Sequence, residues 1–432
     1  MTGAEFFTGT PPVKAQVPGP GGQAHLTAAL LQATLSARRI TAMVALAWDG
    51  PQMWAFSAAL GLGEEPGRVE RLAGALALAA GAESCRVSRG PGRLLIEIPK
   101  PLSERRPLRA GRLDGLTPPS ATSLAVGITT GGQVAWLDLA DERTCHLIIG
   151  GTTGSGKTVA LHWLLYRLLM QNSPLDLRLV ALDPKHTEMA PFEQTPHLLH
   201  PVVSAPLETA RLLAWTTGEL DRRAVRGERQ PRLVVVIEEV ADLMQTSPEA
   251  AGALARIAQI GRGLGVHLIA TTQQPGARSL GEGLMNFPAR LVGRVASATL
   301  TYGAAGRART MADQLLGRGD FLLLTADSTI RVQVPLIDGR QFAQLPRTAQ
   351  VASLEEELPS LVEFADRAVD PRGGQGRREL GPTEYAEIEG ALRDGAGPAE
   401  LRMFGIGWNR AQRLCEAWRE RGKRGKRGKR GN

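Results

Sequence analysis

Residues 151–158 read Gly-Thr-Thr-Gly-Ser-Gly-Lys-Thr, and this stretch decides the fold around it. An apolar run at 146–150 precedes it, and a helical pattern over 159–170 follows it. A strand, a glycine-rich loop and a helix in this order form the context of a phosphate-binding P-loop. The glycines let successive backbone N–H groups converge on a phosphate, and the start of the helix adds the positive end of its dipole. The sequence therefore predicts binding of a nucleoside triphosphate, which we expect to be ATP.

The residues expected to hold the triphosphate are those of the loop itself. Lys157 is expected to reach the β- and γ-phosphates, and the hydroxyl of Thr158 to coordinate Mg²⁺. A chance glycine turn before a helix is the alternative, which the full Gly-x4-Gly-Lys-Thr spacing between strand and helix disfavours. The predicted cofactors are therefore ATP and Mg²⁺. The predicted cofactor-binding residues are Gly151, Thr152, Thr153, Gly154, Ser155, Gly156, Lys157 and Thr158.

Length and composition limit the class of protein. A chain of 432 residues is expected to form about two to four domains, and a hydrophobic content of 43% is ample for globular cores. The three cysteines lie far apart without metal-ligand spacing, as in a reducing cytosol. No run reaches the ~18 uncharged apolar residues that would span a bilayer, and the start lacks a signal-peptide pattern. We expect a soluble, cytoplasmic protein without membrane insertion.

The positive charge is concentrated near the C-terminus. The formal net charge is +8, and from Arg372 onward the chain holds 15 Lys and Arg but 8 Asp and Glu residues. The rest of the chain is therefore close to neutral. A basic appendage on a balanced body suggests contact with a polyanion, nucleic acid first.

Strand and helix patterns alternate between about residues 124 and 337, which predicts a parallel sheet covered on both faces. Polar residues follow three of the predicted strands: Asp183, the pair Glu238 and Glu239, and Gln273. Ligands bind at the carboxyl ends of strands in an open α/β sheet, so we expect these residues at one edge together with Lys157. Taken singly, each is equally well read as an ordinary loop residue.

Separate roles are expected for these side chains. Glu238 is expected to help Thr158 hold Mg²⁺, and Glu239 to polarise the attacking water. Gln273 is placed to sense the γ-phosphate, so Lys157, Glu239 and Gln273 are the predicted catalytic residues. An arginine, sometimes from a neighbouring subunit, usually meets the charge of the transition state. The candidates, each equally well read as a surface arginine, are Arg290, Arg294, Arg307 and Arg309.

Linked blocks of the sequence resemble the FtsK/SpoIIIE family of double-stranded DNA translocases, over roughly residues 40–337. The sequence departs from the family in three places. Glu238 stands where Asp is usual, Gln274 stands where Arg is usual, and the family's Asp-Ser-Arg stretch is poorly matched around residues 302–309. The blocks that carry the resemblance are 146–158, 182–185, 196–199, 201–203, 236–244, 265–275, 315–320 and 331–333.

The resemblance implies a RecA-like P-loop ATPase motor with a small α/β domain before it. It also implies a ring, typically a homo-hexamer, with double-stranded DNA threading the centre and ATP at the subunit interfaces. Many members carry an N-terminal membrane anchor, and we expect a soluble form that lacks one.

Three helical patterns lie near the C-terminus, over 383–393, 398–404 and 408–421. A glycine turn before the last one fits a helix-turn-helix, whose third helix enters the major groove. Asn409, Arg410 and Arg413 lie there, with side chains suited to bases or phosphates. A helical bundle used for protein contacts is the alternative, but residues 405–411 resemble the core of the family's winged-helix DNA-reading domain.

Three Gly-Lys-Arg repeats follow at 422–430, where a wing hairpin would otherwise be expected. Such a tail is predicted to bind phosphates without sequence preference, or alternatively to increase solubility.

The predicted organisation is as follows: a flexible N-terminal lead-in (1–39), a small α/β domain (40–115), the RecA-like motor (116–340), a linker (341–380), a winged-helix-like DNA-binding domain (381–421) and a basic tail (422–432). The predicted function is ATP-driven translocation of double-stranded DNA, by a DNA-dependent ATPase with a C-terminal DNA-reading domain. One alternative is an ATPase of the same motor family that moves protein in secretion. A second alternative is a DNA-binding protein that nucleotide controls without translocation.

Overall fold

The computed structural model describes residues 22–90, 92–274, 287–307, 310–358, 380, 382–404, 406 and 408–425. The chain forms two compact units. Unit 1 comprises residues 1–172, 271–278 and 287–345, and unit 2 comprises residues 173–270, 279–286 and 346–432. Among the described residues, no helix combines the length and the apolar character needed to cross a bilayer.

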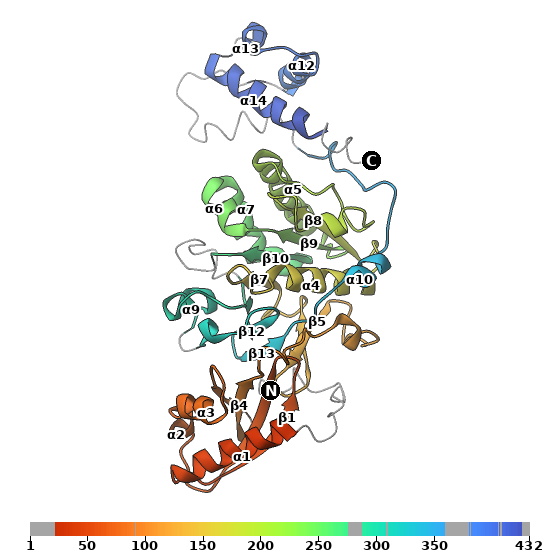
Figure 1. Cartoon of the computed structure of the whole chain (residues 1–432). Coiled ribbons are helices and arrows are strands. Elements are labelled where there is room, and N and C mark those ends of the chain that lie inside the picture. Colours follow the sequence, from red (N-terminus) through yellow and green to blue (C-terminus); the bar gives the residue numbers. More distant parts are fainter. Residues whose placement is uncertain are drawn as a thin grey trace. The chain divides into compact units, whose positions relative to one another are not determined.

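Unit 1 begins with a small α/β domain built on a four-stranded antiparallel sheet of order β1-β2-β4-β3. Helix α1 lies along one face of this sheet (Figure 1) and contacts β1 and α3. Leu31 and Leu35 of α1 are fully buried in one core with Phe56 and Ile96 of the sheet. The elements are α1 (Gly22–Ala37), β1 (Ala42–Asp49), β2 (Met53–Leu60), α2 (Pro66–Glu70), α3 (Ala73–Ala79), β3 (Arg86–Gly90) and β4 (Arg93–Pro99).

Two details of this domain differ from the sequence-based expectation. Residues 22–37 of the expected lead-in form α1, which belongs to the core of the domain. Strand β2 was not predicted, because its apolar run shows no clear alternation. Helices α2 and α3 are short and are separated at Arg71 and Leu72.

The other strands of unit 1 follow the order β6-β5-β13-β12-β11-β7. Strands β7 and β11 run parallel, whereas the pairs β11–β12, β12–β13, β13–β5 and β5–β6 are antiparallel. These strands are β5 (Ser123–Thr129), β6 (Val134–Asp138), β7 (His146–Gly150), β11 (Ala289–Val292), β12 (Asp320–Leu324) and β13 (Thr329–Gln333). The prediction of a parallel sheet is therefore wrong for this part, because short turns join β5 to β6 and β12 to β13 as hairpins.

The helices of this part are α4 (Lys157–Gln171), α9 (Ala298–Ala305) and α10 (Gly339–Gln344). Helix α4, which starts at the end of the glycine-rich loop, is anchored by its apolar residues. Trp163 and Leu164 are fully buried, and the indole N–H of Trp163 donates to the carbonyl of Ala125 in β5 at 2.6 Å. The rest of the helix therefore holds the loop end at a fixed place on the sheet.

A buried group of charges joins the small domain to strands β12 and β13 of unit 1. The guanidinium of Arg331 in β13 donates to Asp320 of β12 at 2.7 and 2.9 Å, and to Glu97 of β4 at 2.8 Å. Arg86 of β3 approaches the same Glu97 carboxylate at 3.7 Å. Two positive and two negative charges thus balance in a region closed to water.

Unit 2 contains the strands that were predicted most closely, in the parallel order β8-β9-β10. They are β8 (Leu177–Leu182), β9 (Arg232–Ile237) and β10 (Val266–Thr272). The last two residues of β10 fall in unit 1. Their continuous apolar runs are typical of strands that are buried on both faces. The helices are α5 (Pro206–Arg226), α6 (Val240–Thr246) and α7 (Pro248–Ile260), and α5 packs against α7.

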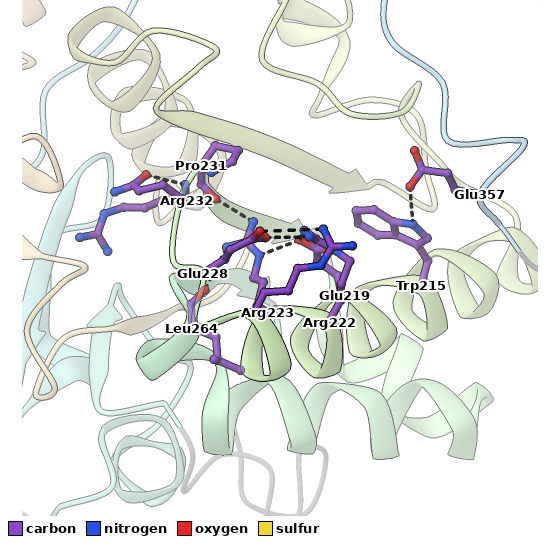
Figure 2. A network of polar contacts seen from close by, with 11 residues as sticks. Trp215, Glu219, Arg222, Arg223, Glu228, Pro231, Arg232, Leu264 and Glu357 are labelled. Atoms are coloured by element: carbon purple, nitrogen blue, oxygen red, sulfur yellow. Dashed lines mark hydrogen bonds and ion pairs between the residues drawn. The ribbon is translucent and has the colours of Figure 1, made fainter.

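The end of α5 is tied to the segments around β9 by a polar network (Figure 2). Arg223 is 3% exposed and donates to Glu219 at 2.7 Å, to the carbonyl of Pro231 at 2.7 Å and to that of Leu264 at 2.9 Å. Burial works to raise the pKa of Glu219, but hydrogen bonds from Arg222 and Arg223 outweigh it and hold that pKa below its ordinary value. The network thus fixes where β9 begins.

The C-terminal part of unit 2 is a cluster of three helices. They are α12 (Pro382–Arg393), α13 (Pro398–Leu401) and α14 (Trp408–Gly425), packed around buried residues that include Ile388, Leu401 and Leu414. All three predicted helices are confirmed, and α14 continues beyond residue 421 into the first residues of the expected basic tail. Among residues 382–404, 406 and 408–425 there is no strand.

We predict that Arg223→Ala lowers the free energy of unfolding by about 2–4 kcal/mol, since it removes a buried charge and leaves two carbonyls unpaired. Urea unfolding monitored by circular dichroism measures the change. The matched control is Arg222→Ala, because Arg222 pairs with the same Glu219 but is 41% exposed. This control is expected to cost at most about 1 kcal/mol. Equal losses in the two variants would contradict the role given to the buried arginine.

Candidate nucleotide-binding site

The glycine-rich loop of unit 1 is held by backbone hydrogen bonds on two sides. The N–H of Gly151 donates to the carbonyl of Thr272 at 3.3 Å, and that of Thr152 donates to the carbonyl of Arg294 at 2.9 Å. Gly156, at the N-cap of α4, has a φ of 104°, which a residue with a side chain rarely adopts. The predicted strand, loop and helix are therefore confirmed, and the loop is fixed before any ligand binds.

Lys157 and Thr158 are the first residues of α4. The amine of Lys157 turns onto the loop and donates to the carbonyls of Gly151 at 2.8 Å and Thr152 at 3.2 Å. The first backbone N–H groups of a helix have no intrahelical partner, and the dipole of this 15-residue helix favours an anion there. A Cβ built on Gly154 would meet nothing within 4 Å, so the loop has open space on that side. These features fit a bound polyphosphate.

The predicted sensor, Gln273, lies beside the loop. It follows β10 directly, and its side-chain oxygen accepts a hydrogen bond from the hydroxyl of Thr153 at 3.3 Å. Both side chains are exposed. The structure thus brings together two residues that are 120 positions apart in the sequence.

A second loop, Gly317–Gly319, supports the nucleotide loop from behind. The N–H of Arg318 donates to the carbonyl of Gly154 at 3.2 Å, and that of Gly319 donates to the carbonyl of Ser155 at 3.0 Å. A Cβ on Gly156 would lie 2.8 Å from the nitrogen of Gly319, so the two backbones meet directly. In the sequence, this loop was noted only as part of a block that resembles the family. Its Gly-Arg-Gly pattern is the feature from which a supporting loop could have been predicted.

The predicted acid pair belongs to unit 2, directly after β9. Glu238 and Glu239 are 6% and 3% exposed, and Glu239 is the N-cap of α6 with a φ of 52°. Such a left-handed conformation in a residue other than glycine stores strain and is frequent at functional sites.

The carboxyl of Glu238 is in an unfavourable environment for its charge. Within the described part of the chain, its Oε2 atom is buried and has no hydrogen-bond partner. Burial raises the pKa of Glu238 to about 7; the positive charge of Lys185 opposes this shift, whereas Glu239 and Asp183 add to it. A cation beside this oxygen would relieve the penalty.

Asp183, the other acid of the predicted edge, has a structural task in unit 2. Its carboxylate accepts hydrogen bonds from the backbone N–H groups of Lys185, Glu188 and Met189, at 2.9–3.2 Å. It thereby shapes the loop after β8.

The orphaned carboxylate oxygen of Glu238 is a ligand of the type that Mg²⁺ binds. No group of three or more His, Cys, Asp or Glu side chains within the described residues is arranged to hold a metal ion. Mg²⁺ does not require such a group, because it usually binds through one or two carboxylates, substrate phosphates and water.

The candidate arginines differ in their surroundings. Arg307 donates to the carbonyl of Ser328 and the hydroxyl of Thr329 at 3.1–3.2 Å, so it holds the turn between β12 and β13. Arg290 is half-buried, and burial lowers its pKa. Arg294 is exposed, and its carbonyl is bonded to the nucleotide loop. Arg309 lies outside the described residues.

The predicted DNA-reading residues lie near the start of α14. Arg413 is exposed and Arg410 is half-buried, while Ala411 and Leu414 of the same helix face the core. The backbone of Asn409 is helical, but its side chain lies outside the described residues.

We predict that Glu238→Gln stabilises the Mg²⁺-free protein at pH 8 but not at pH 4. The folded-state pKa of about 7 lies above the ordinary 4.5, so the folded protein binds the proton more tightly. Stability is therefore lost as the pH rises from about 4.5 to 7. A glutamine at this position does not ionise, so the variant does not lose this free energy of unfolding, which amounts to at most about 3 kcal/mol.

Urea unfolding in EDTA at pH 4, 6 and 8 measures the effect. Glu104→Gln, which changes an exposed carboxyl after β4, is the control. A difference between Glu238→Gln and the wild type that does not vary with pH would contradict the prediction.

Comparison with known proteins places this loop in a family. A family model described as "FtsK/SpoIIIE family" matches residues 117–226 and 224–277. The chain is 31% identical over 421 residues to the DNA translocase FtsK of Rhizobium meliloti (strain 1021), covering 83% of this chain and 47% of that protein. It is 29% identical over 431 residues to the DNA translocase SftA of Bacillus subtilis (strain 168), covering 91% and 44%. The chain thus spans about half the length of these curated relatives.

A solved structure has a similar fold. It is the pCW3 conjugation coupling protein TcpA in its monomer form with ATPγS, with a TM-score of 0.51 and 19% identity, over 73% of this chain and 96% of that one. This likeness concerns the fold alone, and it agrees with the predicted α/β fold of a P-loop ATPase. Residues 117–277 therefore match the FtsK/SpoIIIE family domain.

Proposed function

We propose that this protein is an ATP-driven motor that moves double-stranded DNA. The observation that carries the proposal is the fixed glycine-rich loop at the start of α4, in a chain that aligns over 83–91% of its length with proteins named DNA translocases. A RecA-like motor acting as a ring, typically a homo-hexamer, is part of the proposal. The resemblance of the sequence to the family supports this part.

The chemistry we propose is hydrolysis of the γ-phosphate of ATP. The loop and Lys157 bind the phosphates, and Glu239 accepts the proton of a water whose oxygen bonds to the γ-phosphorus, while the bond to the ADP oxygen breaks. Gln273 reports the state of the γ-phosphate through the loop contact with Thr153. Thr158 and Glu238 would hold Mg²⁺, which supplies positive charge to the phosphate oxygens.

The C-terminal helices are the proposed DNA-reading domain, of winged-helix type. The exposed Arg413, the half-buried Arg410 and the helical position of Asn409 at the start of α14 support this assignment. Contacts of this kind come from the first turns of a recognition helix.

We predict that Lys157→Ala lowers DNA-stimulated ATP hydrolysis at least about 100-fold, because the phosphates lose their main counter-charge. Glu239→Gln is expected to lower turnover about 10²–10⁴-fold as well, while ATPγS still binds. Phosphate release and equilibrium binding measure the two effects. Full hydrolysis by Lys157→Ala would refute the site, and full hydrolysis by Glu239→Gln would refute the proposed base.

Displacement of a third strand from triplex DNA tests the function itself. With ATP, the wild type is expected to strip the third strand, and Lys157→Ala is not. A protein-moving ATPase would show no stimulation by duplex, and a nucleotide-controlled binding protein would bind duplex without turnover. Either result would overturn the proposal.

We predict that Arg413→Ala weakens duplex binding about fivefold or more, since one charged contact to DNA is lost. Fluorescence anisotropy at several salt concentrations measures the affinity and its salt dependence. Arg393→Ala removes an exposed arginine from α12 of the same helical cluster and serves as the control. Equal losses in the two variants would contradict the reading role of α14.

A further inference from the structure

We propose that Gln52 of the small domain is a positioning residue for the glycine-rich loop at residues 151–158. It acts through Arg318, which it contacts and which lies 266 positions later in the sequence. The inference rests on the proposed binding of ATP, and it adds that the small domain sets the shape of the phosphate cradle. The connection runs from Gln52, through the carbonyl of Arg318, to the loop that begins at Gly151.

The first step is the contact between Gly317–Gly319 and the nucleotide loop. Hydrogen bonds from Arg318 and Gly319 occupy the carbonyls of Gly154 and Ser155 at 3.2 and 3.0 Å. The carbonyl of Ser155 and the N–H of Gly156 belong to one planar peptide unit, so the hydrogen bond from Gly319 also fixes the direction of that N–H. A shift of Gly317–Gly319 therefore changes the direction of the groups that bind phosphate.

The second step is the strained backbone of the supporting loop. Gly317, Arg318 and Gly319 all have positive φ angles, of 75°, 51° and 93°. Arg318 has a side chain, so its left-handed conformation costs on the order of 1 kcal/mol or more and persists only when its surroundings enforce it. Residues 317–319 therefore need hydrogen bonds from other parts of unit 1 to keep this conformation.

The third step concerns the hydrogen bonds that hold residues 317–319 in place. The side-chain amide of Gln52 donates to the carbonyl of Arg318 at 2.9 Å, and that of Gln333 donates to the same carbonyl at 3.3 Å. The N–H of Val334 donates to the carbonyl of Gly319 at 2.7 Å. Two of these three donors belong to β13 and the residue after it, whereas Gln52 comes from the small domain.

The fourth step is that Gln52 is itself held in place. It is 5% exposed, in the turn between β1 and β2, and its own carbonyl accepts a hydrogen bond from the N–H of Lys100 at 2.9 Å. The buried ion pair between Glu97 and Arg331, with an N–O distance of 2.8 Å, fixes β4 to β13. The small domain thus presents a rigid donor to the loop.

The test compares Gln52→Ala with Gln32→Ala in the chain of residues 1–432. Gln32 is a half-buried glutamine of α1 that bonds the backbone of Ala42 at 2.7 Å and Val44 at 2.9 Å, within the small domain. Removal of Gln32 is expected to lower the melting temperature at least as much as removal of Gln52. The readouts are the affinity for ATPγS with Mg²⁺, by isothermal titration calorimetry, and the KM and kcat of ATP hydrolysis.

We predict that Gln52→Ala weakens ATPγS binding and raises KM about fivefold, as expected for one lost hydrogen bond, while kcat changes less. Gln52→Glu keeps the size of the side chain but offers no donor, so it is expected to lose at least as much affinity. Gln32→Ala is expected to bind within about twofold of the wild type, because its hydrogen bonds do not reach the loop.

Three outcomes would overturn the inference: wild-type affinity in Gln52→Ala, wild-type affinity in Gln52→Glu, or an equal loss of affinity in Gln52→Ala and Gln32→Ala. Failure of the wild type to bind ATPγS is a different result, because it would refute the proposed function rather than the role of Gln52.

Discussion

The ion pairs of Arg331 are the constraint on which the arrangement of unit 1 depends. A guanidinium that is 6% exposed is tolerated only if carboxylates replace its water, and Asp320 and Glu97 do so with three hydrogen bonds. Burial opposes the charge of Arg331, but the two carboxylates outweigh it and hold its pKa above the ordinary value. Loss of either partner would leave a buried charge without compensation, so β4, β12 and β13 keep one relative position.

The same charges reach the phosphate cradle through the backbone. Asp320 accepts a hydrogen bond from the N–H of Leu316 at 2.7 Å, which closes the loop that contains Arg318. Gly156 and Gly319 bring two backbones into direct contact, so this loop cannot move toward the start of α4. A displacement at the small domain is therefore transmitted by stiff groups, namely ion pairs, peptide units and a helix.

The local features of this chain could be predicted from its sequence, and the long-range ones could not. The loop at Gly151–Thr158 and the strands β8, β9 and β10 carry their signal within a few residues, as fixed spacing or as unbroken apolar runs. Strands β5, β6 and β13 are antiparallel, and β13 pairs with β5 some 200 residues earlier, at Val332 and Thr129. No local pattern specifies such a partner.

The same reason explains which parts of the candidate site were missed. Gln52 and Glu97 have no motif around them, and each acquires its role from a residue more than 230 positions away. The environment of Glu238 is also non-local, because its raised pKa comes mainly from the burial of β9 and its end. Residue type and spacing identified the acid pair, but burial decides its charge.

Burial gives the acid pair a property that its sequence does not show. Burial makes the charge of Glu238 costly, and the neighbouring carboxyls of Glu239 and Asp183 add to that cost, so the pKa of Glu238 is raised. A cation that approaches the unpartnered oxygen of Glu238 favours its ionised form. The charge of this carboxyl is therefore decided by what lies beside it, and the longer side chain of Glu238, where Asp is usual, remains compatible with the metal-holding role proposed for it.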